Sequence, residues 1–200
     1  MNLETFKKKC GTQERVFIVF LTLSLLLLTF KTFYFNTFNT YLLLIYSLLT
    51  ALFCILIFLA YYDFKKMEVH NSTSMLLMLF LIIINLLLFL LLKDRESILL
   101  INNWEYNPYK NILGGIFLGS LFQLIVLITK EKGLGQGDVR IAIITGLITG
   151  LNSIIVWGYI SVFSALAYGL ILSRKKKRFK GLKIPFLPFM ILGIIALILF

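Results

Sequence analysis

Long apolar segments, separated by short polar or charged connections, constrain the fold of this 200-residue chain most strongly. A helix needs about 20 mostly apolar residues to cross a bilayer. The chain offers seven such segments, of which the fifth is short, so we expect an all-α, polytopic transmembrane helix bundle of six to seven spans. The fifth and sixth segments could also form one broken helix pair packed inside the bundle. The candidate spans are residues 16–35, 41–61, 74–92, 112–129, 139–151, 154–172 and 184–200.

Composition also indicates a membrane protein. Hydrophobic residues make up 60% of the chain, charged residues only 14%, and the mean hydropathy is +0.94. So few charges cannot cover the surface of a soluble domain of this length, and we therefore expect a single membrane domain over residues 1–200. Cys10 and Cys54 lie far apart and outside any Cys-x-x-Cys pair, which argues against a structural zinc site and against a disulfide framework.

Basic runs in alternate connections carry the net charge of +11. Such runs mark cytoplasmic loops, so we expect a multi-pass protein of the inner (plasma) membrane with its N-terminus inside. No small-residue cleavage site follows the first apolar segment, which predicts a retained span. The run at residues 174–178 suits anionic membrane lipid, and we favour that partner over nucleic acid. In this topology the loops after residue 61 and before residue 139 share the cytoplasmic face.

Two of the three aspartates end long apolar segments, where an acid is costly and marks a functional site by default. Asp63 precedes Lys65 and Lys66, and the alternative interpretation is a juxtamembrane acid offset by two lysines. Asp138 ends the run Gly-Leu-Gly-Gln-Gly-Asp, and the alternative is a glycine-rich turn with this acid as the N-cap of a helix. Because both acids face the cytoplasm, their carboxyl groups can meet. Asp94 lies in a mixed-charge outer loop and is expected to be solvated.

Three short motifs resemble the signatures of the type IV prepilin peptidases and archaeal preflagellin peptidases. The first is Asp63, followed by basic residues and by Asn71 eight positions later. The second, at residues 135–140, is Gly-x-Gly-Asp followed by a small aliphatic and a basic residue. The third, at residues 183–189, is a basic residue followed by an Ile-Pro-Phe run that opens the last span. The resemblance covers residues 42–200, and its supporting residues are Gly135, Gly137, Asn71, Arg140, Lys183, Pro185 and Pro188.

The chain departs from this family pattern at two positions. His70 stands where the family has proline, so Asn71, Ser72 or Ser74 is expected to cap the next helix in its place. We interpret His70, the single histidine, as a residue at the helix start rather than as a base or metal ligand. Leu187 stands where the family has glycine, which predicts a less close backbone approach near the site. Larger relatives carry a Cys-x-x-Cys region linked to N-methylation, and its lack here predicts a peptidase without methyltransferase activity.

The resemblance implies an aspartyl endopeptidase with Asp63 and Asp138 as the catalytic pair, requiring no metal and no cofactor. One carboxyl group would be ionised and the other protonated, because like charges a few ångströms apart do not both ionise. The implied substrate is a type IV prepilin-like or pseudopilin precursor, which is cut after a short basic leader at the cytoplasmic membrane face.

Two other functions stay open. A presenilin-like intramembrane aspartyl protease also carries Tyr-Asp and Gly-x-Gly-Asp motifs. It would have Pro-Ala-Leu before the last span, where this chain has Pro185-Phe186-Leu187. The other alternative is a non-catalytic polytopic membrane protein, and a transporter among these is disfavoured because the chain lacks two similar halves.

Overall fold

A computed structural model describes residues 19, 22, 40–91, 98–101, 104–131, 133–176 and 184–199. The rest of the predicted span at 16–35 lies outside these residues, as do Asp94 and Lys183. The elements, in chain order, are α2 (Thr40–Lys66), α3 (Asn71–Leu91), β1 (Ile98–Ile101), β2 (Trp104–Tyr106), α4 (Pro108–Thr129), α5 (Gln136–Lys176) and α6 (Leu187–Leu199).

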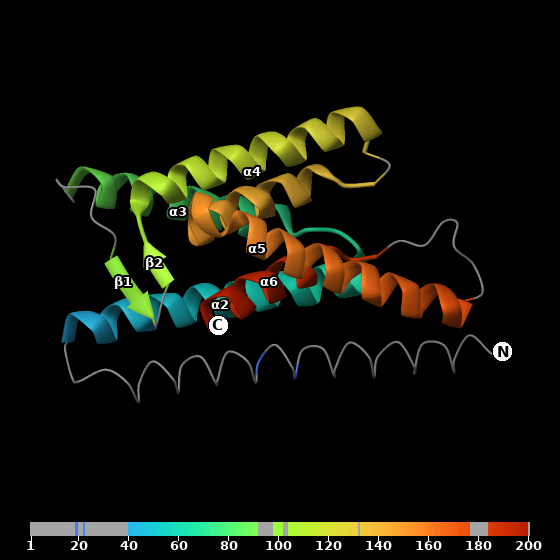
Figure 1. The fold of residues 1–200 in the computed structure, drawn as a ribbon, viewed down its shortest axis with the longest axis horizontal. Coiled ribbons are helices and arrows are strands. Elements are labelled where there is room, and N and C mark those ends of the chain that lie inside the picture. Colours follow the sequence, from blue (N-terminus) through green and yellow to red (C-terminus); the bar gives the residue numbers. More distant parts are fainter. Residues whose placement is uncertain are drawn as a thin grey trace.

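The helices lie roughly side by side, and their ends fall into two groups (Figure 1). The end of α2, the start of α3, the end of α4, both ends of α5 and the start of α6 gather at one end of the bundle, which we call the motif end. The hairpin of β1 and β2 lies toward the opposite end. Because all three sequence motifs fall in segments at the motif end, the arrangement agrees with the loop alternation predicted from charge. Which end faces the cytoplasm stays a prediction.

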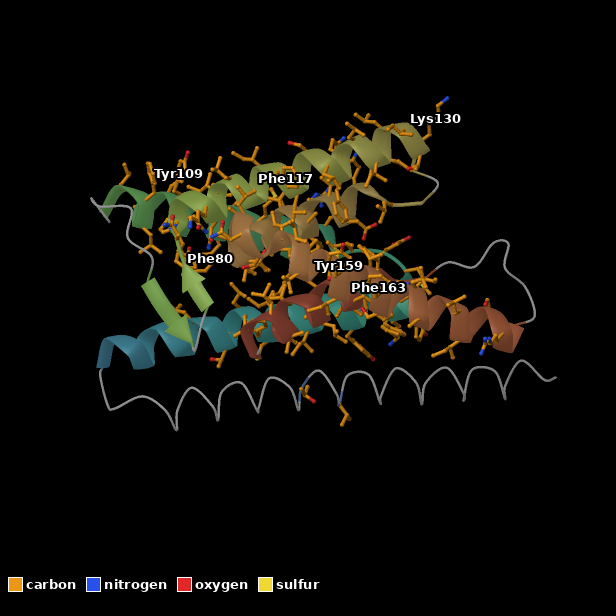
Figure 2. The ribbon with its side chains drawn as sticks, in the orientation of Figure 1. Phe80, Tyr109, Phe117, Lys130, Tyr159 and Phe163 are labelled. Carbon is orange, nitrogen blue, oxygen red and sulfur yellow. The ribbon has the colours of Figure 1, made fainter. Side chains whose placement is uncertain are left out.

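Large apolar side chains cover the outside of the described helices. Three of these helices, namely α3, α4 and the long α5, are long and apolar enough to cross a membrane, and α6 is a shorter apolar helix. Figure 2 marks Phe80 on α3, Phe117 on α4, and Tyr159 and Phe163 on α5, all of which are exposed. Soluble monomers do not expose apolar faces of this extent. The chain is therefore a helical membrane protein, as expected, while the count of six to seven spans remains a prediction.

The long helix α5 is broken at Gly150, whose backbone angles (φ 69°, ψ 168°) are not helical and suit glycine, which has no Cβ atom. The side chain of Asn111 in α4 lies directly against Gly150 and fills the space that a Cβ atom would need. The helix doubles back there into a first arm, residues 136–149, and a second arm, residues 151–176 (Figure 1). The two arms correspond to the predicted fifth and sixth apolar segments. The first arm is buried, as the alternative of a broken pair inside the bundle expects, whereas the second arm exposes an apolar face.

The first arm of α5 and the helix α6 form the centre of the bundle. Ile141 and Ile144 on the arm are completely buried, as are Ile191 and Ile194 on α6. Helix α4 packs extensively along α5, where Gly114 and Gly146 bring the two backbones into contact. Helix α3 also packs on α5, whereas α2 packs mainly on α6. Most of the first arm of α5 is therefore enclosed by protein, while its second arm buries one face and exposes the other.

The connection between α3 and α4 differs from the loop that the sequence predicts. It contains an antiparallel hairpin in which Ile98 of β1 pairs with Tyr106 of β2. The Tyr106 hydroxyl donates a hydrogen bond to Asn85 Oδ1 in α3 at 2.8 Å, which ties the hairpin to the bundle. Asn107 then caps α4, because its Oδ1 accepts the backbone N–H of Lys110 at 3.2 Å. Among the residues that the structure describes, this hairpin holds the only strands, and it lies far from the motif end.

Candidate active site

Asp63 lies in the last turn of α2, beyond the apolar stretch at residues 41–61. The helix ends at Lys66, and Met67 takes a left-handed conformation (φ 57°) and donates its N–H to the Asp63 carbonyl at 2.8 Å. The Asp63 side chain is 5% exposed. Its Oδ2 atom is buried and has no hydrogen-bond partner among the described residues. A buried carboxyl oxygen without a partner is a candidate for contact with water or substrate.

The third motif brings the start of α6 to Asp63. The backbone N–H of Leu187 donates a hydrogen bond to the Asp63 carboxylate. The side chain of Leu187 is completely buried, and Pro185 and Pro188 on either side of it are buried too. The predicted loss of a close backbone approach at Leu187 is wrong, because the side chain packs into the core and leaves the N–H directed at Asp63.

Asp138 is the third residue of α5, in the glycine-rich second motif. Its Oδ2 accepts the backbone N–H of Gly135 at 2.9 Å, and its own N–H donates to the Gly135 carbonyl at 3.0 Å. An acid that reaches back in this way satisfies a free N–H at the helix start. The alternative in which Asp138 is itself the N-cap is therefore wrong, since α5 begins two residues earlier at Gln136.

Two contacts join the first motif to the second. Arg140 Nη1 donates a hydrogen bond to Asn71 Oδ1 at 2.9 Å, across 69 positions of sequence. Gly137 packs so closely on Val69 that a Cβ atom at Gly137 would lie 2.7 Å from the Val69 Cβ. Only glycine fits this position without displacing its neighbour. The two motifs, distant in the chain, are thus fixed to each other on both sides of Asp138.

Asp63 and Asp138 line one cavity of about 790 Å³ at the motif end. Its walls come from the connection after α2, the connection after α4 and the residues just before α6. Asn71, Gly135, Gly137 and Pro185 are among the predicted site residues that line it. The structure therefore brings the two predicted acids together with members of all three motifs.

Burial raises the pKa of Asp63 from 3.8 to about 7, and the negative charge of Asp138 is the second cause. The hydrogen bond from the Leu187 backbone opposes this rise, because it favours the ionised form. A carboxyl group with such a pKa holds a proton near neutral pH. A proton-holding acid beside a second acid is an arrangement suited to general acid–base chemistry.

A model of the type IV leader peptidase family matches residues 50–170, which include Asp63, Asn71 and the whole second motif. The chain belongs to the type IV leader peptidase family. No curated protein and no solved structure matches it in the other two comparisons. Membership in this family makes the chain a leader-peptidase-like protease, and the third motif, outside the matched residues, is joined to the matched part through Leu187 and Asp63.

His70 caps the helix α3. Its Nδ1 accepts the backbone N–H of Thr73 at 3.3 Å, and its carbonyl accepts the N–H of Ser74 at 3.0 Å. The predicted place of His70 at a helix start is confirmed. Residue 71, 72 or 74 was expected to provide the cap, but His70 itself provides it. The side chain of Asn71 instead accepts a hydrogen bond from Arg140.

Sequence reasoning did not find two other residues that line the cavity, Glu68 and Glu131. Both are exposed and line the cavity with the two aspartates. Each lies in a short turn that follows the end of a helix. The only sequence feature that could have indicated a role at the site was closeness to a motif, and this is weak evidence for a charged surface residue. Within the described ranges, no three His, Cys, Asp or Glu side chains gather in a way that could hold a metal ion.

Proposed function

We propose that this leader peptidase is a membrane aspartyl endopeptidase of the prepilin-peptidase type, with Asp63 and Asp138 as its catalytic pair. The observation that carries the proposal is that these two acids, from the end of α2 and the start of α5, line the same cavity. The negative charge of Asp138 contributes to the raised pKa of Asp63, so the two carboxyl groups are electrostatically coupled. Two acids coupled in this way are what peptide hydrolysis without a metal requires.

The environments of the two acids support a division of roles. Asp63, with a pKa of about 7, holds the proton. Burial disfavours the ionised form of Asp138 as well, and the Gly135 N–H that its Oδ2 accepts opposes this effect. We assign the ionised carboxylate to Asp138 because its negative charge is the one that acts on Asp63. Asp138 then takes a proton from water while the water oxygen bonds to the scissile carbonyl carbon, and Asp63 gives its proton to the carbonyl oxygen. The intermediate collapses when Asp138 passes its proton to the amide nitrogen, the C–N bond breaks, and Asp63 recovers its own proton.

The charges at the cavity support a cationic substrate segment. Four carboxyl side chains line it, from Asp63, Glu68, Glu131 and Asp138, and among the described lining residues none is lysine or arginine. The nearby Lys66 is engaged elsewhere, because its Nζ donates to the Tyr62 hydroxyl at 3.0 Å. We therefore propose a type IV prepilin-like or pseudopilin precursor as substrate, with a basic leader entering from the cytoplasm.

The position of the acids favours a cut at the membrane boundary over a cut within a span. Asp63 is in the last turn of its helix and Asp138 in the first turn of its own. A presenilin-like enzyme would have to unwind a substrate helix inside the bilayer, where backbone groups have no water to bond. A leader that ends just before an apolar segment reaches the motif end without unwinding.

Co-expression with a prepilin-like precursor tests this function. We expect a shortened product whose new N-terminus, read by N-terminal sequencing, lies just before the apolar segment. Asp63→Asn and Asp138→Asn should each abolish processing while the protein still accumulates in the membrane. Asp94→Asn is the matched control, since Asp94 is the one other aspartate of the chain, and it should process normally. Processing by either active-site variant would refute the pair, and a product that starts deep inside the apolar segment would favour the presenilin-like alternative.

A further inference from the structure

The helices that carry the two acids do not pack extensively on each other. Among the described elements, α2 packs mainly on α6, while α5 packs on α4, α6 and α3. The separation between Asp63 and Asp138 is therefore not fixed by a direct α2–α5 interface. It is set through α6, which packs on both helices, and through the contacts that join the segment after Asp63 to the start of α5.

The hydrogen bond from Arg140 to Asn71 is a specific side-chain link between those segments. Asn71 begins α3, five residues after the end of α2, and Arg140 lies in α5 two residues after Asp138. The contact of Gly137 with Val69 lies beside it. Both ends of the link are held in place, because His70 caps α3 and Gly135 is bonded to Asp138.

Helix capping does not account for the position of the Asn71 side chain. An asparagine at a helix start commonly accepts a backbone N–H. Here the His70 ring accepts the N–H of Thr73, and Asn71 Oδ1 accepts the guanidinium of Arg140. The charged guanidinium of Arg140 therefore bonds to the neutral side-chain amide of Asn71, although the carboxyl group of Asp138 is only two residues away in sequence.

We propose that Asn71 and Arg140 are positioning residues, whose hydrogen bond fixes the start of α5 to the start of α3 and so holds Asp138 opposite Asp63. This role rests on the proposed aspartyl mechanism, since it gives the bond a catalytic purpose. The bond acts on the reaction through the positions of the two acids. Opening it lets Asp138 move away from Asp63 while the bundle, which is held by its apolar core, stays folded.

A double-mutant cycle on the full-length protein measures this coupling. Asn71→Ala and Arg140→Ala should each lower kcat by roughly 10- to 100-fold, because small displacements of a catalytic group are that costly. The double variant should be no worse than the single ones, since both remove the same bond. Arg140→Lys keeps a donor and should recover part of the rate. Tyr106→Phe is a matched control, because it removes a polar bond between elements at the opposite end of the bundle and should leave kcat unchanged.

Titration of Asp63 provides a readout that a purely structural role would not move. The ionisable groups that share the cavity with Asp63 are Asp138 on α5 and the exposed Glu68 and Glu131, while α6 contributes the Leu187 N–H. If the bond opens, the charge of Asp138 acts less on Asp63, and infrared titration should show the Asp63 pKa moving down in both variants. Loss of the positive Arg140 would by itself move it up, and Asn71→Ala removes no charge. A downward shift in both variants can therefore come only from displacement.

The outcomes separate this role from the proposed function. Additive losses in the cycle, or an Asp63 titration unchanged in Asn71→Ala, would overturn the positioning role even if the two acids are essential. Processing by Asp63→Asn would instead overturn the aspartyl mechanism, and the titration, which needs no substrate, would still decide whether the bond holds the acids together. Thermal melting of each purified variant establishes that the comparison is made on folded protein.

Discussion

Asp138 raises the pKa of Asp63 across a shared cavity, although 75 positions (138 − 63) separate the two residues in sequence. Burial is the larger cause of the rise, so the effect of Asp138 is added to an acid that is already reluctant to ionise. Two groups coupled in this way titrate as a pair. Several consequences of that coupling can be measured directly.

The rate of processing should fall as pH rises through about 7. The productive pair carries one proton, and Asp63, with a pKa of about 7, retains it below that value. Above it the pair becomes doubly ionised, and no acid remains to protonate the carbonyl oxygen. The measurement is kcat/KM against pH for purified protein in detergent. A rate that stays constant up to pH 9 would show that Asp63 does not hold the essential proton.

Asp63→Asn should make folding stability less dependent on pH. The folded pKa of Asp63, about 7, lies above its ordinary value of 3.8. A raised pKa contributes stability that is fully present below 3.8 and is lost as pH rises through about 7. The native chain should therefore lose more thermal stability between pH 5 and pH 8 than the variant does. Thermal melting of both proteins in the same detergent measures these losses. Equal losses in the two proteins would contradict the assigned pKa.

Glu68→Gln combined with Glu131→Gln should raise KM for a substrate with a basic leader by roughly 2- to 10-fold, with little change in kcat. Both side chains are exposed and line the cavity, so each acts through a solvent-screened attraction of modest strength. The effect should shrink at high salt. Glu105→Gln, in the hairpin far from the motif end, is the matched control. A KM equal to that of the native chain would remove these glutamates from leader recognition.

Gly150→Ala should destabilise the protein by about 1–3 kcal/mol. The new Cβ atom meets the Asn111 side chain, and a residue with a Cβ atom is strained at a positive φ. Gly158→Ala is the matched control on the second arm of α5, where a Cβ atom has open space, and it should be neutral or stabilising. Denaturation of both purified variants gives the comparison, and equal stability would argue against the break in α5.

Thiol labelling checks which face of the membrane the motif end occupies. In a variant without Cys10 and Cys54, single cysteines at Lys65 and Gly133 should be protected from an impermeant reagent in intact cells. A cysteine at Lys93 should react. Labelling of Lys65 and Gly133 from opposite faces would separate the two acids and contradict the shared cavity.

Much of the site could be predicted from the sequence, because apolar length sets where spans end and acids at those ends stand out. Asp63 and Asp138 were found in this way, whereas Pro185 came from the family resemblance, and all three line one cavity. Glu68 and Glu131 were not found, because an exposed glutamate in a turn carries no local signal and the cavity forms only when three distant segments come together. The backbone donor at Leu187 was missed for a related reason, since residue type says little about where a backbone N–H points. The short hairpin lacks a usable alternating pattern in its four- and three-residue strands.

The doubled-back helix α5 has a consequence for how the protein is made. Its first arm, at 1.5 Å per residue, is about 21 Å long, which is shorter than the roughly 30 Å hydrocarbon core. Residues 141–150 are buried apart from Ile143, so protein surrounds this arm. A segment this short is not stable alone in lipid. It becomes stable only when α4, which precedes it in the chain, and α6, which follows it, have packed around it. Asp138 lies at the start of this arm, so the proposed pair of acids comes together only when the arm has packed against its neighbouring helices.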